Sequence, residues 1–281
     1  PKPAKVKALF ILLLPLGFSC ARVGPQNEHC SCPGRMQGCQ QHPFFWHPPG
    51  SPEACSYTSA HPEDGSMRTL SRTLLQRLPD DVREELHAMA RSQRPLAFST
   101  LCSGTDCPAL AIKAFDEALA EDAACAIVAA QQEFACESNV NKRMFLSRMC
   151  PQIPLIFKDV AELSGASAQD HLSGKAQCVP RVEGTIGGFP CTDVSRLNGR
   201  ARTAENTACV SSASLRTGFV FDRICAYVKS RRPEFRWLVL ENVQALAQSG
   251  PDGGASNLDV CCQRLQEELN FVVLVFFLDA R

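Results

Sequence analysis

The chain has 281 residues, and its 29 basic residues balance its 29 acidic ones. This balance excludes a general electrostatic attraction to nucleic acid or to an anionic membrane, so either partner requires a local basic patch. Hydrophobic residues make up 45% of the chain, which suits a globular core, and the length allows one large domain or two small ones.

The 16 cysteines are scattered along the chain rather than closely spaced as in small disulfide-rich domains. We therefore interpret most of them as reduced, buried, small apolar residues. Cys30, Cys32 and Cys39, with His29 and His42 nearby, come closest to a metal pattern. Their spacing lacks a second paired half, so a cysteine-containing tail is favoured over a zinc site, and we predict no metal site.

The apolar run at 8–21 follows three lysines and resembles the hydrophobic core of a signal peptide. It is short and interrupted by Pro15, which disfavours a membrane span. Residues 22–66 are rich in Pro, Gly, His, Ser and Cys and show no periodicity. We therefore predict that 1–66 is a mostly disordered, Cys- and Pro-rich region with an apolar run.

Helical spacing fills 67–94, with a break near Pro79, and predicts a helical linker. From residue 95 onward, apolar strands alternate with helical patterns. The predicted strands are 95–102, one within 126–137 at its "EFACE" end, 154–160, 181–188, 235–243 and 271–280. The predicted helices are 107–122, 139–149, 215–232 and 257–269, and 165–177 is predicted to be a loop. This alternation predicts an α/β fold with a mostly parallel, Rossmann-like sheet and helices on both faces.

Polar or nucleophilic residues follow the predicted strands. They are Gly104, Glu137, Asp159, Cys191 and Glu241, each at or just after the end of a strand. Singly, each has an ordinary structural explanation as a turn glycine, a helix-capping acid or a buried thiol. Because ligands bind at the carboxyl ends of parallel strands, five such residues at one sheet edge indicate a functional site.

Several of these segments resemble the motifs of cytosine-5 DNA methyltransferases. "GGFPCTDVS" resembles the nucleophile loop of that family, and "LVLENV" resembles its Glu-Asn-Val strand end, 50 residues after the cysteine. "LAFSTLCSGTD" resembles the cofactor loop, while "FACESN" and "FKDV" resemble the segments with the ribose-binding and adenine-contacting acids. The resemblance covers residues 98–280 and is most specific at the Pro-Cys and Glu-Asn-Val pair.

The resemblance implies an S-adenosyl-L-methionine-dependent methyltransferase fold. Glu137 is expected to bind the ribose hydroxyls of the cofactor and Asp159 its adenine amino group. The methionine end is expected to lie against the loop at 101–105. The full set of expected cofactor residues is Leu101, Cys102, Ser103, Gly104, Thr105, Glu137, Ser138, Asp159 and Val160.

The resemblance also implies the chemistry. A Cys191 thiolate adds to carbon 6 of cytosine so that carbon 5 can accept a methyl group, and we expect backbone amides to lower the pKa of this thiol. Glu241 activates the ring at nitrogen 3. Asn242 is expected to order the loop that carries Pro190 and Cys191. Ser195 is expected to contact the substrate, and the cytosine has to leave the duplex stack.

The chain departs from the family pattern at three places. Asp106 replaces the usual second glycine of the cofactor loop, and Thr192 replaces the glutamine that often follows the nucleophile. The chain also ends at Arg281, before a glutamine-arginine motif, a target-recognition region, and a closing strand and helix. We therefore predict that 95–281 is an incomplete catalytic domain that binds cofactor weakly and turns over poorly.

Two alternatives to a DNA (cytosine-5-)-methyltransferase remain open. One is a tRNA cytosine-5 methyltransferase of the same family, and the other is a catalytically incompetent cofactor-binding or regulatory fragment. A Rossmann-like oxidoreductase is disfavoured because no G-x-G-x-x-G loop is present. We expect a monomer in the nucleus that has DNA as its partner, with RNA as the alternative, and does not contact membranes.

Overall fold

The structure is a computed structural model that describes residues 6–15, 67–91, 95–123, 130–195, 216–232, 234–249 and 254–280. The cysteines and histidines between residues 29 and 42 lie outside this part of the chain. So do residues 124–129, which include the start of the segment 126–137 in which the second strand was predicted.

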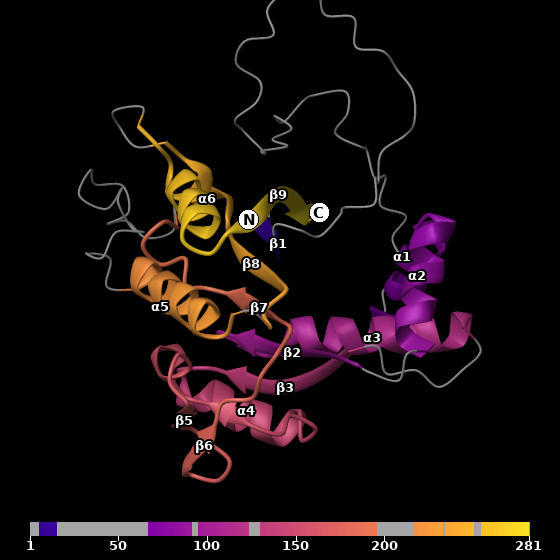
Figure 1. Ribbon diagram of the computed structural model, residues 1–281, viewed down its shortest axis with the longest axis horizontal. Coiled ribbons are helices and arrows are strands. Elements are labelled where there is room, and N and C mark those ends of the chain that lie inside the picture. Colours follow the sequence, from indigo (N-terminus) through magenta and orange to yellow (C-terminus); the bar gives the residue numbers. More distant parts are fainter. Residues whose placement is uncertain are drawn as a thin grey trace, which may run out of the picture.

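One seven-stranded sheet organises the described residues, with strand order β4-β3-β2-β7-β8-β1-β9 (Figure 1). Its strands are β1 (Val6–Pro15), β2 (Leu96–Leu101), β3 (Ala130–Cys136), β4 (Ile156–Phe157), β7 (Gly184–Gly188), β8 (Trp237–Val243) and β9 (Phe271–Ala280). The neighbours from β4 to β8 pair in parallel, while β1 pairs antiparallel with both β8 and β9. The mostly parallel sheet that we predicted is therefore present.

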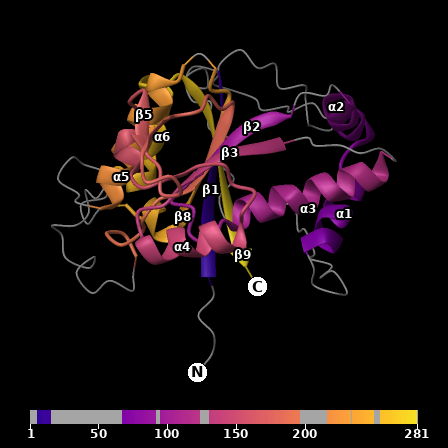
Figure 2. The same ribbon diagram turned by 90° about the horizontal axis from the view of Figure 1, so that it is seen from below.

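Helices cover both faces of this sheet. They are α3 (Cys107–Asp122), α4 (Val140–Met149), α5 (Thr217–Ser230) and α6 (Asn257–Glu267). Phe134 and Cys136 of β3 join the main core with α5 and α6, whereas Ala135, between them, packs in a second core with Leu146 of α4. Since successive strand residues point to opposite faces, α4 and α5 lie on opposite sides of β3. Figure 2 likewise shows α3 on one side of the strands and α5 and α6 on the other. This is the Rossmann-like α/β arrangement expected from the sequence.

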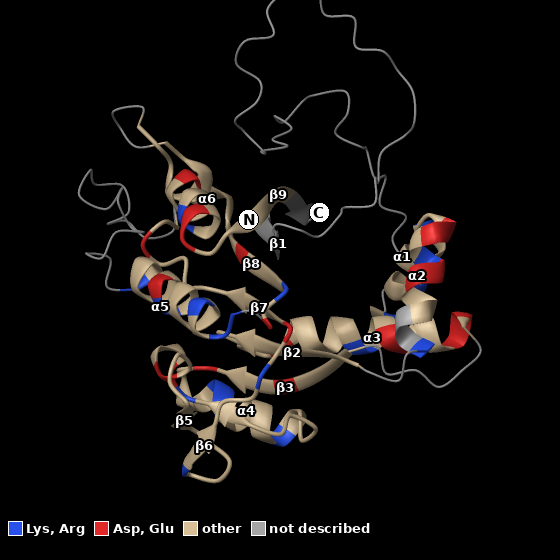
Figure 3. Cartoon of the chain, in the orientation of Figure 1, with Lys and Arg blue, Asp and Glu red and all other residues tan. Residues whose placement is uncertain are grey.

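The helical pattern of 67–94 forms two helices, α1 (Met67–Arg77) and α2 (Asp80–Arg91), with the expected break near Pro79. α1 packs on α3, where Leu75 and Leu119 form a small buried cluster. Arg72 Nε donates to Glu121 Oε2 at 2.8 Å, which adds an exposed ion pair at the same contact. Figure 3 shows that the charged residues lie mainly on helices and loops, while the sheet is mostly uncharged. None of the described helices has the length and apolar character needed to cross a membrane.

The predicted loop at 165–177 contains a small antiparallel pair, β5 (Ser167–Gln169) and β6 (Ala176–Cys178). Asp170, in the turn between them, accepts hydrogen bonds from the backbone N–H groups of Ile156 and Ser173 at 2.9 and 2.7 Å. These strands have three residues each and no apolar alternation, so periodicity did not reveal them.

The apolar run near the N-terminus was interpreted wrongly as leader-like. Residues Val6–Pro15 form β1, which places Phe10 opposite Glu241 of β8 and Leu9 opposite Phe277 of β9. The parallel strands β8 and β9 are separated by one strand position, and β1 fills it. A continuous apolar run is typical of a strand with neighbours on both sides, and its local sequence does not distinguish it from a leader.

Candidate functional site

The carboxyl ends of five parallel strands place the predicted residues along one edge of the sheet. Strand order runs outward in opposite directions from β2 and β7, so the boundary between these two strands is a topological switch point. The expected cofactor residues follow β2, β3 and β4. The expected catalytic residues follow β7 or lie near the end of β8, on the other side of that boundary.

The loop after β2 has an unusual backbone. Cys102, Gly104 and Asp106 all have positive φ, at 52°, 59° and 58°. The Gly104 N–H donates to Glu137 Oε2 at 2.8 Å, and the Asn139 N–H donates to Glu137 Oε1 at 2.8 Å. Glu137 is 5% exposed, so both of its oxygens hold backbone in a shielded position. The carboxylate therefore fixes the loop to the end of β3.

Two of the expected cofactor residues have side chains that face inward. Leu101 is 1% exposed and belongs to the main core. Ser103 Oγ lies 2.9 Å from Thr100 Oγ1, and the Ser103 N–H donates to Cys136 O at 3.1 Å. Both side chains are therefore directed into the protein rather than toward a ligand.

The other expected cofactor residues divide between surface and core. Thr105 and Ser138 are exposed, whereas the side chain of Val160 is buried in the main core. Asp159 is exposed and caps the 3-10 helix Val160–Glu162, with Oδ1 accepting from the Ala161 N–H at 2.8 Å. Asp159 is thus an accessible acid beside the end of β4.

Asp106, which differs from the family pattern, belongs to a buried polar cluster. Gln132 Nε2 donates to Asp106 Oδ2 at 2.7 Å and to Thr100 Oγ1 at 3.0 Å. Asp106 Oδ1 is buried without a hydrogen-bond partner among the described residues. Burial raises the pKa of this carboxyl, while the hydrogen bond from Gln132 acts in the opposite direction.

The segment that carries Cys191 leaves the end of β7 and is anchored in the core. The ring of Phe189 is buried and lies 5.6 Å from that of Phe221 of α5, measured between centroids. Asn242, which is 2% exposed, donates from Nδ2 to Phe189 O at 3.0 Å. Asn242 thus contacts the segment before Cys191, which we expected Asn242 to order. Pro190 and Cys191 follow this anchor and are half-buried.

A tight turn follows Cys191. The backbone N–H groups of Val194 and Ser195 both donate to Cys191 O, at 3.1 and 2.8 Å. Ser195, the expected substrate contact, is half-buried in this turn. Asp193, which lies between Cys191 and Ser195 in the chain, is hydrogen-bonded to Thr217 at the start of α5. Sequence reasoning missed this contact, because neither residue stands in a motif that links the two segments.

The electrostatics at Cys191 differ from the expectation. Burial raises the pKa of the thiol, and the negative charge of Glu241 raises it further, outweighing a backbone hydrogen bond that acts in the opposite direction. Burial also raises the pKa of Glu241. Because the negative charge of the Glu241 carboxylate disfavours a thiolate at Cys191, protonation of Glu241 favours ionisation of Cys191.

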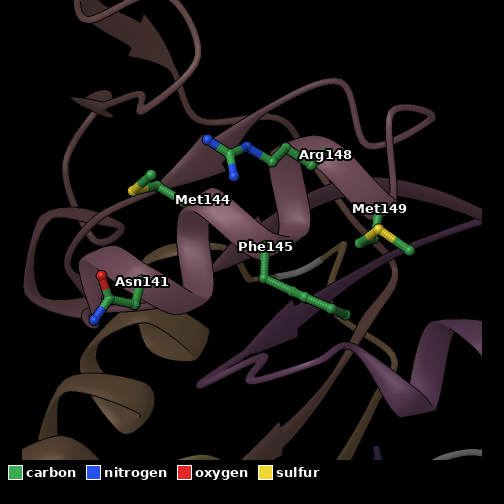
Figure 4. Close-up of a pocket in the computed structure, with 5 residues that line it drawn as sticks. All are labelled: Asn141, Met144, Phe145, Arg148 and Met149. Atoms are coloured by element: carbon green, nitrogen blue, oxygen red, sulfur yellow. The ribbon is translucent and has the colours of Figure 1, made fainter.

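A separate hollow of about 330 Å³ lies on the outer side of α4 (Figure 4). None of the residues predicted from the sequence lines it. Its lining consists of Asn141, Met144, Phe145, Arg148 and Met149. Within the described ranges, no group of three or more His, Cys, Asp or Glu side chains could hold a metal ion.

Comparison with known proteins identifies two fungal relatives, each named DNA (cytosine-5-)-methyltransferase DMT5. The protein of Cryptococcus neoformans var. grubii serotype A is 29% identical over 170 residues, 60% of this chain and 7% of that protein. The protein of Verticillium dahliae is 27% identical over 104 residues, 36% of this chain and 4% of that protein. The chain thus spans a small part of these relatives' length. They confirm the resemblance to cytosine-5 methyltransferases that the motifs indicated.

Among solved structures, Streptomyces venezuelae DesVI matches with a TM-score of 0.26 and 8% identity, over 66% of this chain and 54% of that chain. This similarity is too low to bear on function. No family model matches the chain.

Proposed function

We propose that residues 95–281 are the cofactor-binding and nucleophile-bearing part of a cytosine-5 DNA methyltransferase. One observation carries this proposal: Cys191 and Glu241 lie at the ends of two adjacent parallel strands, close enough for the charge of Glu241 to raise the pKa of Cys191. A thiol and a raised-pKa carboxyl side by side can attack and protonate one ring together. The names of the two fungal relatives support the same activity.

In the proposed reaction, the Cys191 thiol loses its proton to solvent, and the thiolate Sγ forms a bond to carbon 6 of cytosine. The electron pair of the 5,6 double bond moves toward carbon 5, and protonated Glu241 gives a proton to nitrogen 3. Carbon 5 then accepts a methyl group. Nitrogen 3 gives its proton back to Glu241. Loss of the carbon-5 proton to solvent re-forms the 5,6 double bond, and the carbon–sulfur bond breaks with its electron pair returning to Cys191.

The raised pKa of Glu241 suits this order of events. Burial keeps Glu241 protonated to a higher pH than an exposed carboxyl, so it can act as a donor. While Glu241 stays neutral, it does not oppose the Cys191 thiolate. When Glu241 gives its proton to the ring, its negative charge beside Cys191 returns. Because a second negative charge nearby is unfavourable, this charge stabilises the covalent adduct, in which the sulfur is neutral, relative to a free thiolate.

The loops after β2, β3 and β4 fit a nucleoside-bearing cofactor. Gly104 lets the backbone approach a ligand closely, and Glu137 and Asp159 place carboxylates after β3 and β4. S-adenosyl-L-methionine, when bound, supplies an electrophilic methyl group. Each oxygen of Glu137 accepts one backbone N–H and keeps a second lone pair, with which Glu137 would hold the ribose hydroxyls of the cofactor. Asp159 would hold its adenine amino group, while the backbone at 101–105 would face its methionine end.

The proposed substrate is a cytosine that has left the DNA stack, because a half-buried thiol cannot reach carbon 6 inside a duplex. A DNA substrate implies that the protein acts in the nucleus.

Covalent trapping tests the proposal. The chain is incubated with S-adenosyl-L-methionine and a DNA oligonucleotide containing 5-fluorocytosine, whose carbon 5 cannot lose a proton. We expect an adduct that survives denaturation, is absent in Cys191→Ser and is strongly reduced in Glu241→Gln. An adduct that persists in Cys191→Ser would refute the role of Cys191.

A parallel RNA oligonucleotide distinguishes the alternatives. Adduct on RNA alone would replace the DNA proposal with a tRNA methyltransferase. No adduct on either substrate, with measurable S-adenosyl-L-methionine binding by calorimetry, would replace it with a cofactor-binding module.

A further inference from the structure

Two reciprocal hydrogen bonds join the Cys191 turn to the first residue of α5. The Asp193 N–H donates to Thr217 Oγ1 at 3.2 Å, and the Thr217 N–H donates to Asp193 Oδ2 at 2.8 Å. Each residue thus binds the other through one backbone group and one side chain, as the two ends of a capping box do. Here the two residues are 24 positions apart.

The contact provides a hydrogen-bond acceptor for the backbone at the start of α5. The N-cap residue, Arg216, makes no side-chain capping bond. Asp193 supplies that acceptor from outside the helix, and its negative charge lies near the positive end of the helix dipole. Thr217 is 0% exposed, so the contact is shielded from solvent on the helix side.

The position of this contact relative to Cys191 gives it a further role. Two other anchors of the segment, the ring contact of Phe189 with Phe221 and the hydrogen bond from Asn242, precede Cys191. The contact of Asp193 follows it, within the turn closed on Cys191 O. Val194, in the same turn, also packs against the main core. Cys191 is therefore held from both sides, and the Asp193–Thr217 pair supplies two hydrogen bonds that join the turn after Cys191 to α5.

We propose that Asp193 and Thr217 form a clamp that sets the position of Cys191 relative to Glu241. Asp193 is a positioning residue, since it acts through the turn rather than on the substrate. The effect of the clamp on adduct formation rests on the proposed function, but its effect on Cys191 itself does not.

The test uses the variants Asp193→Ala, Asp193→Asn, Thr217→Val and Thr217→Ser. Asp222→Ala is the matched control, because Asp222 is an aspartate of α5 that pairs with Arg264 and not with the Cys191 turn. The first readout is the rate of Cys191 alkylation by iodoacetamide across pH, followed on its peptide by mass spectrometry. The second is the rate of adduct formation with 5-fluorocytosine DNA, beside the S-adenosyl-L-methionine Kd.

Release of the turn admits water to Cys191 and moves Cys191 away from Glu241, and both changes lower the pKa of the thiol. The pH profile of Cys191 alkylation should therefore move to lower pH in Asp193→Ala and Thr217→Val. Adduct formation should fall about 10- to 100-fold in both, the cost expected for a misplaced reacting group, with the Kd unchanged. Thr217→Ser keeps the hydroxyl and should match wild type. Asp193→Asn keeps an acceptor oxygen and should lie between. Each single variant removes one of the two reciprocal hydrogen bonds and keeps the other. The double variant Asp193→Ala/Thr217→Val should therefore lose more than either single variant and less than the sum of the two losses.

Each alternative outcome decides the proposal. Unchanged Cys191 alkylation in Asp193→Ala and Thr217→Val overturns the clamp, as does an equal change in Asp222→Ala. If Asp193→Ala does not fold, Thr217→Val against Thr217→Ser gives the same comparison, because Thr217→Val exchanges the hydroxyl for a methyl group and Thr217→Ser keeps the hydroxyl. If wild type forms no adduct, the proposed function fails, and the alkylation profiles still decide whether the clamp exists.

Discussion

Gly188 and Glu241 are backbone partners across β7 and β8, and a methyl group on Gly188 would lie 3.1 Å from Glu241 Oε2. The glycine therefore leaves the space that the carboxyl occupies. Gly188 itself is exposed, so the crowding would fall on Glu241 rather than on the core. This pairing links the strand before the nucleophile directly to the acid.

Gly188→Ala should displace the carboxyl of Glu241 by a few tenths of an ångström. Because proton transfer depends on position, we expect adduct formation on 5-fluorocytosine DNA to fall about 10- to 100-fold, with little change in the thermal midpoint. Gly254→Ala is the control, since a methyl group there meets nothing within 4 Å. Wild-type adduct formation in Gly188→Ala would show that Glu241 can move without loss.

Glu241→Gln should change two properties of the site in opposite senses. Removal of the negative charge lowers the pKa of Cys191, so site-resolved alkylation of Cys191 should reach its half-maximal rate at lower pH. Adduct formation should nevertheless fall about 10²- to 10⁴-fold because the acid is lost. Glu267→Gln, at an exposed position of α6, provides the control. An unchanged or upward shift of the alkylation profile would contradict the electrostatic coupling.

Asp106→Asn should stabilise the protein at neutral pH. Burial raises the folded-state pKa of Asp106, so the folded chain holds this proton more tightly than the unfolded chain. The resulting stability is present below the unfolded pKa and is lost as the pH rises through the folded pKa, at about 1.4 kcal/mol per pKa unit. Asparagine carries no charge, and it tolerates the positive φ of this position.

Thermal midpoints from pH 3 to pH 8 measure this effect. The gain of Asp106→Asn over wild type should be largest at pH 7 and should shrink toward pH 3. Asp81→Asn, at an exposed position of α2, is the control. A gain that grows as the pH falls would reverse the sign and refute the argument.

Ile11→Pro should destabilise the sheet through its backbone. Ile11 of β1 lies opposite Leu240 of β8 and Val275 of β9, so proline removes an N–H between two strands. The lost hydrogen bond and its unpaired acceptor should together cost about 2–4 kcal/mol in urea unfolding. Ile11→Val keeps the N–H and should cost far less. Equal stability of the two variants would mean that β1 does not pair in the sheet.

The sequence predicted those features that depend on local pattern. The helix Cys107–Asp122 was located to the residue, because Pro108 marks its first turn and apolar spacing continues behind it. The alternation of strands and helices was sufficient to predict the parallel sheet. The order of residues along the sheet edge followed from that topology, since parallel strands end on the same side.

The features that were missed depend on contacts between distant segments. β1 was misinterpreted because the gap that it fills is created by strands more than 200 residues later. The direction of the Cys191 pKa shift depends on burial and on Glu241, neither of which a loop sequence reveals. The pairing of Asp193 with Thr217 spans a segment with no pattern of its own.

The insertion of β1 also bears on how the chain folds. β1 is the earliest of the described strands to be synthesised, yet its partners β8 and β9 are the last two. During translation the backbone N–H and C=O groups of β1 have no strand partner until β8 and β9 are synthesised, whereas the strands from β2 to β7 can already associate. Completion of the sheet is thus a late, long-range event, the kind of step that slows folding and leaves an apolar segment open to chaperones.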